Sequence, residues 1–517
     1  MDNVNLIRNF MVQNGLSYLL VNSTNEFLAE YNSLAENSRY KITGFSGSTG
    51  EALVTEQTIY LFVDGRYHIQ AEQEVDRSKV TVVKLQSGEK YQDELLKRIP
   101  QTETLGVFAK KNSQKKVEAL QKERMLKLFD TDPLDGEIRP ADDENIMLDK
   151  NLTGLTSEEK ISKIAHKLSP DEALYITDPD EVSYIFNMRC FSKIFSAKIK
   201  AKALILKDNA ILFTQDKQNH LEEFLKSIQK EVFVDKSSIN AFDYKLLNNP
   251  NEMIINPVKE MKARKTSAEL EHLKDAFAKT DTVLGTVREY IMDNDNLSEF
   301  DIAIKLAQEF KNQGALGLSF NSIVAKDKNS ALAHYSKSLK DEIITDGSLV
   351  LIDCGGYFEG GLATDITRVF VKGEPSELHK KIYTTVLRAF LHAYNYETPQ
   401  NGYEIDKSVH EFFDSQDLDG FVFNHGLGHG IGINVHEYPP SLSSGDIAKY
   451  QLDDGMCFSI EPGLYKQGFF GIRLESVCYY LNGKIHPFTR MNYEQKLINF
   501  DLLTEQEKQW LCEFEVK

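Results

Sequence analysis

The sequence has no apolar run of about 18 residues, the length that a membrane-spanning helix needs. Residues 1–14 also lack the basic stretch and apolar core of a signal peptide. Cysteine is scarce, with 5 in 517 residues. These cysteines are odd in number and scattered along the chain: Cys190, Cys354, Cys457, Cys478 and Cys512. We therefore expect a cytoplasmic protein without a membrane segment, whose thiols are buried and reduced.

Basic residues are in deficit, because 60 Lys and Arg stand against 78 Asp and Glu, a formal net charge of −18. Nucleic acids and anionic membranes both attract basic surfaces, so this charge argues against either partner. Apolar residues make up 41% of the chain and charged residues 27%, which is ordinary for a soluble globular protein. A chain of this length has room for several domains.

Two common catalytic signatures are incomplete. The glycine-rich segment at residues 43–50 is not followed by Lys-Ser or Lys-Thr, which excludes a P-loop. His425 and His429 have the spacing of a zinc-binding helix, but the glycines between them would break a helix, and His-Glu-x-x-His is missing. Cys354 follows Asp353 in a strand-like run, and neighbouring strand side chains point to opposite faces. A thiol nucleophile at Cys354 is therefore not expected, because its side chain should face away from Asp353.

The sequence does contain acids and one histidine at the ends of strand-like runs or beside glycines, between residues 348 and 476. The candidate ligands are Asp353, Asp365, His429, Glu461 and Glu475. Strand ends project side chains from rigid backbone into a cleft, which suits a metal site. Four carboxylates and one imidazole favour hard cations such as Mn²⁺, and their charges balance two divalent ions. The pattern therefore predicts a two-metal centre that activates a hydroxide.

These segments, in this order, resemble the metallopeptidase family that contains methionine aminopeptidase, prolidase and aminopeptidase P. The resemblance implies the pita-bread fold of that family. It also implies that Asp353 chelates one metal, while Asp365 and Glu475 bridge both metals. By the same resemblance, His429 and Glu461 hold the other metal.

One spacing departs from the family pattern. Asp353 and Asp365 are 12 positions apart, one more than in many members. We expect the glycine-rich turn at residues 355–361 to absorb the extra residue, because hairpin loops vary in length.

Three further residues near the candidate ligands, together with the ligand Glu461, gain a catalytic role from the resemblance. It implies that His334 contacts the substrate near the scissile bond and that His436 stabilises the tetrahedral intermediate. It also implies that His425 lines the same pocket and that Glu461 is the general base. For each histidine taken alone, a structural role is the alternative.

The segment Asp64–Tyr67, near the N-terminus, resembles one that is typical of creatinase and aminopeptidase P. The resemblance implies that Arg66 reaches towards the substrate, in the active site of a partner subunit. A surface arginine after a tight turn is the alternative interpretation.

Strand-like and helix-like segments alternate twice before the region of the acids, which suggests a duplicated unit. We predict an α+β protein with two creatinase-like α/β domains, at residues 1–135 and 136–257. A pita-bread catalytic domain would follow at residues 258–517, its first helix opened by a capping box at Thr266. The lysines at residues 110–122 predict a helix with a solvated basic face.

The three-domain length and the motifs together resemble aminopeptidase P. That resemblance implies release of the N-terminal residue from peptides whose second residue is proline. Proline fixes φ and has no N–H, so ordinary aminopeptidases handle this bond poorly. The expected cofactor is a pair of divalent ions per subunit, Mn²⁺ first among them, and the expected assembly is a homodimer.

Two other functions remain as alternatives. A prolidase would cut only Xaa-Pro dipeptides, but prolidases are shorter than this chain. A peptide- or protein-binding module with a dead site would have lost ligands, whereas all the ligand positions here hold competent side chains.

Overall fold

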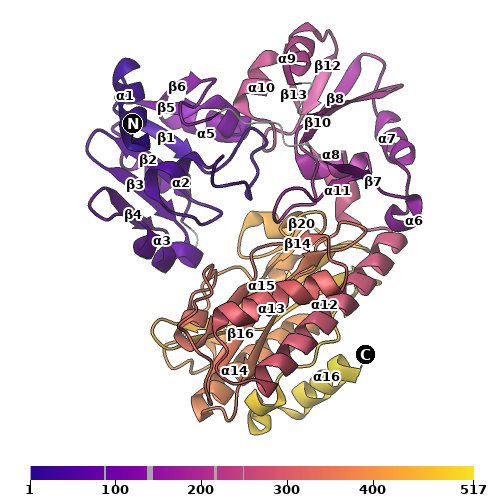
Figure 1. Ribbon diagram of the computed structural model, residues 1–517. Helices are drawn as coiled ribbons and strands as arrows, with labels where there is room; N and C mark the ends of the chain where they lie inside the picture. The colour runs from indigo at the N-terminus through magenta and orange to yellow at the C-terminus, as the bar shows by residue number, and fades with distance from the viewer. Residues whose placement is uncertain (1, 87–88, 137–143, 215–217, 249, 517) are drawn as a thin grey trace. The chain divides into compact units, whose positions relative to one another are not determined.

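The computed structural model describes residues 2–86, 89–136, 144–214, 218–248 and 250–516 (Figure 1). The chain forms two compact units. The N-terminal unit comprises residues 1–144, 157–188 and 199–258, and the C-terminal unit comprises residues 145–156, 189–198 and 259–517. The predicted domain limits at 135 and 257 stay predictions. Within the described ranges, no helix has both the length and the apolarity of a membrane span.

The N-terminal unit begins with a six-stranded sheet in the order β4-β3-β2-β1-β5-β6. Its strands are β1 Tyr18–Asn22, β2 Glu51–Thr55, β3 Ile59–Val63, β4 Val80–Lys84, β5 Thr104–Phe108 and β6 Met125–Phe129. Its helices are α1 Asn3–Gln13, α2 Ser38–Thr43, α3 His68–Glu74, α4 Tyr91–Leu96 and α5 Gln114–Glu123. In β1, Leu19 and Val21 pack in one core while Leu20 packs in another, so both faces of the sheet are covered.

A second sheet in this unit has five strands in the order β11-β10-β8-β12-β13. The strands are β8 Glu172–Ile176, β10 Ala201–Leu206, β11 Ala210–Thr214, β12 Glu231–Val234 and β13 Asn251–Glu252. The helices are α7 Ser157–Ala165, α8 Pro179–Ile185, α9 Gln218–Ser227 and α10 Ala241–Leu246. β8 pairs antiparallel with β10 and parallel with β12, as β1 does with β2 and β5. This shared topology agrees with the suggested duplication.

Two expectations were wrong in detail. Lys111 does not belong to a solvated face, because its side chain is buried and its ammonium donates hydrogen bonds to Asp132 (2.7 Å) and Asp135 (2.6 Å). Two carboxylates offset the charge there, which makes burial tolerable. Four of the cysteines are free and buried as expected, but Cys512 is exposed.

The C-terminal unit is built around an eight-stranded sheet in the order β15-β16-β18-β24-β21-β19-β20, with β25 beside β24. Its strands are β15 Ile323–Lys326, β16 Leu349–Cys354, β18 Ile366–Val371, β19 Gly428–Gly430, β20 Glu437–Leu442, β21 Cys457–Ile460, β24 Glu475–Leu481 and β25 Lys484–Pro487. Its long helices are α12 Ser267–Asp293, α13 Glu299–Asn312, α14 Glu377–Tyr394, α15 Gly402–Asp414 and α16 Glu505–Val516. Short elements are β7 Asn145–Met147, α6 Lys150–Thr153, β9 Met188–Cys190, α11 Pro257–Ala263, β14 Gly317–Leu318, β17 Gly356–Tyr357, β22 Gly463–Lys466 and β23 Phe470–Arg473.

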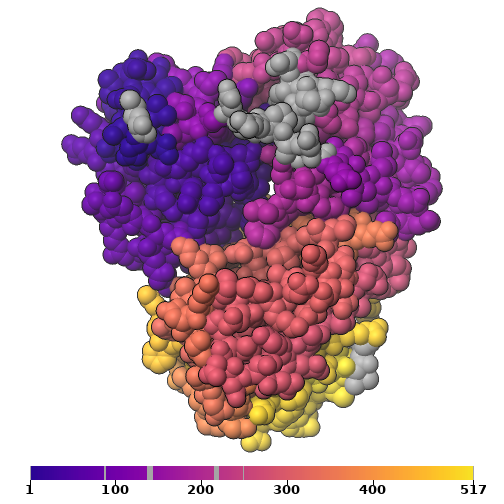
Figure 2. Space-filling view, viewed as in Figure 1, coloured from indigo at the N-terminus to yellow at the C-terminus, as the bar shows by residue number. Residues whose placement is uncertain are grey.

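Helices cover both faces of this sheet. The predicted capping box at Thr266 is present and opens α12, which lies beside α13 (Figure 1). Val350 and Ile352 of β16 pack with α12 and α13, whereas Leu349 and Leu351 pack with α14 and α15. This alternation follows the two-residue period of a strand. In Figure 2 the near face of this unit is formed mainly by the red and orange segments that include α12 and α13. The sheet is therefore an interior layer, the pita-bread arrangement.

Candidate metal centre

Three polar side chains form one row across the middle of the eight-stranded sheet. Asp353 in β16 pairs with Thr367 in β18, and Thr367 pairs in turn with Glu475 in β24. Directly opposed residues of paired strands point to the same face, so these side chains project together. The Thr367 hydroxyl donates a 2.7 Å hydrogen bond to the Glu475 carboxylate. Strand register thus brings together two acids that lie far apart in the sequence.

Asp365 lies just before β18, two residues ahead of Thr367, and therefore belongs to the same face. The turn that joins it to Asp353 contains a tight backbone contact at Gly355. A Cβ on Gly355 would lie 1.8 Å from the Thr364 carbonyl oxygen, so only glycine fits there. With this turn, both aspartate side chains lie on the same face of the sheet.

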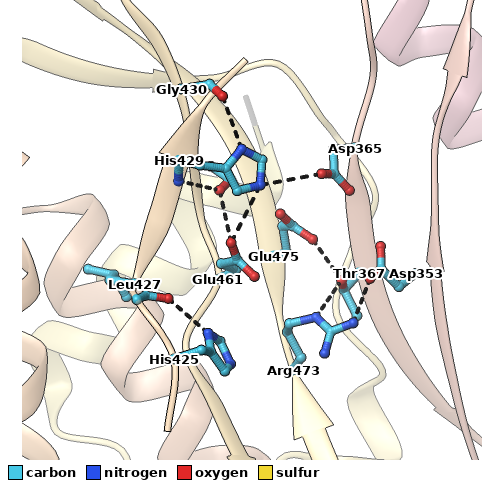
Figure 3. Close-up of polar contacts among 12 residues, drawn as sticks. Asp353, Asp365, Thr367, His425, Leu427, His429, Gly430, Glu461, Arg473 and Glu475 are labelled. Atoms are coloured by element: carbon cyan, nitrogen blue, oxygen red, sulfur yellow. Dashed lines mark hydrogen bonds and ion pairs between the residues drawn. The ribbon is translucent and has the colours of Figure 1, made fainter. Parts of the chain in front are cut away.

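His429 and Glu461 reach the site from the other half of the sheet. A Cβ at Gly428 would lie 2.0 Å from the Ser459 carbonyl oxygen, so glycine is what lets β19 approach β21. The Ser459 hydroxyl accepts a 3.1 Å hydrogen bond from the His429 backbone N–H. The His429 Nε2 atom then lies 3.5 Å from Glu461 Oε1 and 3.6 Å from Asp365 Oδ2 (Figure 3).

These side chains converge on a small region that is poor in hydrogen-bond donors. Asp365, His429 and Glu475 each offer a ligand atom, and these atoms lie within 4.8 Å of one another. Three of the buried carboxylate oxygens at this site have no hydrogen-bond partner among the described residues: Asp353 Oδ1, Asp365 Oδ1 and Glu475 Oε1. Bare carboxylate oxygens in a dry site are costly unless a cation takes them.

The carboxyl pKa values at this site also indicate that a cation binds there. Burial raises the pKa of Asp365, and the charges of Glu475 and Asp353 raise it further. Burial also raises the pKa of Glu475, with Glu461 and Asp353 adding to the effect. Such acids ionise together only when positive charge enters the site. Carboxylate oxygens with one imidazole suit divalent cations such as Mn²⁺, so the residues present fit a metal centre.

Arg473 is a buried cation at this site that sequence reasoning missed. Its Nη2 atom lies 2.5 Å from Asp353 Oδ2, and its Nε atom donates to the Thr367 hydroxyl at 3.1 Å. Its Nη1 atom donates to the Tyr465 hydroxyl (2.9 Å) and to the Ala333 carbonyl (3.2 Å). The guanidinium therefore orients the Asp353 carboxylate, and its single charge offsets only part of the negative charge of the acids. The sequence signal that could have pointed to Arg473 is its position two residues before Glu475, in the same strand-like run.

The structure places the three predicted histidines near this site, each in a different contact. The His436 ring lies 4.4 Å from the His429 ring, centroid to centroid. The His425 Nε2 atom is 2.9 Å from the Tyr465 hydroxyl, so His425 joins the same hydrogen-bond network. His334 is half-buried, and it directly follows the residue whose carbonyl accepts from the buried arginine.

Arg66 belongs to the N-terminal unit. Its guanidinium pairs with Asp64 at 2.8 Å and donates to the Thr49 hydroxyl at 3.1 Å. The pair follows β3 directly, as the turn signal indicates. A role for Arg66 in substrate binding stays a prediction.

Comparisons with known families identify three domains in the chain. The profile described as Metallopeptidase family M24 matches residues 271–480. Residues 271–480 therefore form a metallopeptidase family M24 domain. Two profiles described as Creatinase/Prolidase N-terminal domain match residues 4–140 and 138–269, so the M24 domain follows two creatinase-like domains.

Named relatives align over almost the whole chain. A probable Xaa-Pro aminopeptidase P from Laccaria bicolor is 28% identical, with 98% of this chain and 88% of the relative covered. Xaa-Pro aminopeptidase 1 from Dictyostelium discoideum is also 28% identical, with 99% and 91% covered. The solved structure of X-prolyl aminopeptidase from Caenorhabditis elegans, a cytosolic enzyme with a di-nuclear active site, gives a TM-score of 0.88 at 20% identity, covering 96% of this chain and 90% of that one. The last similarity confirms the fold of this protein.

Proposed function

We propose that this protein is a Xaa-Pro aminopeptidase, which removes the N-terminal residue from peptides whose second residue is proline. The observation that carries the proposal is the surplus of buried carboxylates around His429, with bare oxygens that a cation would satisfy. The preference for proline is supported by the relatives of that name, which align with all three parts of the chain.

We propose that two divalent ions, Mn²⁺ first among the candidates, bind at this centre. The residues that would hold them are Asp353, Asp365, His429, Glu461 and Glu475. When bound, such a pair supplies an activated water and stabilises charge at the scissile carbonyl. Arg473 keeps the Asp353 carboxylate oriented for this task through its 2.5 Å contact.

The remaining groups handle protons and the substrate. Glu461 takes a proton and passes it to the leaving amine, and the Ser459 hydroxyl holds its carboxylate through a 3.3 Å hydrogen bond. His436 stabilises the oxygen that becomes charged as the carbonyl is attacked. His334 contacts the substrate near that bond, and His425 lines the same pocket.

We further propose that the protein is a cytoplasmic homodimer in which Arg66 of one subunit reaches the substrate of the other. Cytoplasmic placement is supported by the Caenorhabditis elegans enzyme, which is described as cytosolic. Light scattering on the purified protein tests the dimer, and Arg66→Lys tests the contact. If Arg66 touches the substrate, this variant raises KM in the dimer while metal content stays constant.

Hydrolysis assays separate the proposal from its two alternatives. The protein is incubated with a Xaa-Pro-Xaa tripeptide and with a Xaa-Pro dipeptide, with and without added Mn²⁺. Cleavage of the tripeptide that depends on metal supports the aminopeptidase. Cleavage of the dipeptide alone indicates a prolidase, and no cleavage together with no bound metal indicates a binding module.

A further inference from the structure

Glu299 is a buried carboxylate that the proposed function does not use. It is the first residue of α13 and has an exposed fraction of 0%. Its Oε1 atom accepts hydrogen bonds from the Lys326 backbone N–H (2.6 Å) and from the Asn329 side-chain amide (2.9 Å). Its Oε2 atom accepts from the Tyr335 hydroxyl (2.6 Å) and from the Leu339 backbone N–H (3.0 Å). Each oxygen therefore binds one backbone donor and one side-chain donor.

All four donors belong to one segment, residues 326–339, which contains His334 and is called the His334 loop below. Oε1 of Glu299 holds the beginning of this loop, and Oε2 holds its end. The described residues give Glu299 no ion-pair partner, so these hydrogen bonds are what satisfies its buried carboxylate oxygens. Burial and the neighbouring Glu299 raise the pKa of Tyr335, which keeps its hydroxyl protonated as a donor.

The opposite side of the His334 loop is tied to the metal centre. The Ser330 hydroxyl donates to the Gly471 carbonyl at 2.9 Å and accepts from the Gly471 N–H at 2.8 Å. A Cβ on Gly471 would lie 2.1 Å from the Ser330 carbonyl oxygen, so the two backbones touch. The Ala333 carbonyl accepts from Arg473, which also holds Asp353.

His334 therefore lies between two fixed neighbours. The residue before it, Ala333, is held by Arg473, and the residue after it, Tyr335, is held by Glu299. Fixing both neighbours restricts the backbone from which the imidazole projects, and such restriction sets how well a side chain is pre-organised for its substrate.

We propose that Glu299 is a positioning residue that orders the His334 loop and so orients His334 for the substrate; this rests on the proposed peptidase function. Glu299 touches neither the metal ligands nor the reacting atoms. We expect its effect on turnover to pass through His334.

A double-mutant cycle tests this role with the Mn²⁺-loaded protein and a Xaa-Pro-Xaa tripeptide. Glu299→Gln replaces one oxygen by an amide that cannot accept its two donors, so we expect kcat/KM to fall roughly 10- to 100-fold. Tyr335→Phe removes a single donor, and we expect a smaller fall. In the His334→Ala background, adding Glu299→Gln is expected to cause no further loss, because the group it positions is gone. Glu309→Gln, on the same helix and paired with Lys305, is the matched control and should leave kcat/KM unchanged.

Hydrogen–deuterium exchange separates this proposal from the proposed function. In Glu299→Gln we expect faster exchange across residues 326–339 and unchanged exchange in β16 and β18, whether or not the protein cleaves the tripeptide. Unchanged exchange in the loop would overturn the positioning role. So would losses of kcat/KM that multiply when Glu299→Gln and His334→Ala are combined, or a loss of bound metal in Glu299→Gln. Absence of cleavage by the wild-type protein would instead overturn the peptidase function. If Glu299→Gln does not fold, Tyr335→Phe carries the same cycle and the same exchange measurement.

Discussion

Two buried groups of charges, one in each compact unit, are balanced in opposite ways. In the N-terminal unit, Lys202 and Asp243 are both buried and lie 2.7 Å apart, and the Tyr175 hydroxyl donates to the same carboxylate at 2.8 Å. In the C-terminal unit, acids gather around His429 and leave three carboxylate oxygens bare among the described residues. A matched pair needs nothing from outside the chain. A surplus of one sign indicates that a ligand of the other sign belongs there.

The largest effect is expected when one of the surplus acids around His429 is removed. Asp365→Ala deletes a proposed bridging ligand, so we expect turnover to fall about a thousandfold or more and bound metal to fall with it. The metal-free variant should be at least as stable as the metal-free wild type, because a repelling charge has gone. Kinetics, metal analysis and thermal melts in a chelator measure the three quantities. Near-native turnover would show that the metal assignment is wrong.

Removing one member of the Lys202–Asp243 pair should lower the stability of the fold and leave metal binding unchanged. Asp243→Asn leaves the buried Lys202 ammonium with only the more distant Glu26 carboxylate, at 3.8 Å, so we expect a loss of about 3 kcal/mol in the free energy of unfolding. Metal content per folded molecule should not change. Urea denaturation gives the free energy, and the double variant Lys202→Met/Asp243→Leu should recover much of it. A loss smaller in Asp243→Asn than in the double variant would contradict the paired-charge interpretation.

A pair of glycine variants sharpens the account of the metal centre. In Gly428→Ala the new methyl group meets the Ser459 carbonyl at 2.0 Å, so β19 must move and carry His429 with it. We expect roughly 10- to 100-fold lower kcat/KM. Gly426→Ala is the control, because its nearest contacts are 3.3 and 3.4 Å and little has to shift. Similar losses in both variants would count against a special role for the close approach.

The smallest effect concerns acid stability in the N-terminal unit. Burial opposes ionisation of Asp64, but the hydrogen bonds and charge of Arg66 outweigh it and lower the Asp64 pKa. A lowered pKa stabilises the folded state above about pH 4, and this contribution is lost as pH falls further. Asp64→Asn should therefore lower the free energy of unfolding at neutral pH. It should also make that free energy depend less on pH below about pH 4. Urea midpoints measured across that pH range check this, and an unchanged acid limb would refute it.

Much of the metal centre was predictable because its signals are local. An acid at the end of an apolar strand, as at Asp353, or a histidine between glycines, as at His429, can be recognised from a few neighbouring residues. The capping box at Thr266 is equally local, and α12 begins where it predicts. The spacing from Asp353 to Asp365 was harder, because the turn between them depends on a backbone contact at Gly355.

By itself the sequence located the acids and the histidine beside strand-like runs and glycines, and its motifs identified the M24 domain. Only the tertiary structure decided that Arg473 orients Asp353, that Glu299 holds both ends of the His334 loop, and that Lys111 is buried. These contacts join residues that are far apart along the chain. Long-range pairing depends on strand register and helix packing, which no short segment of sequence contains.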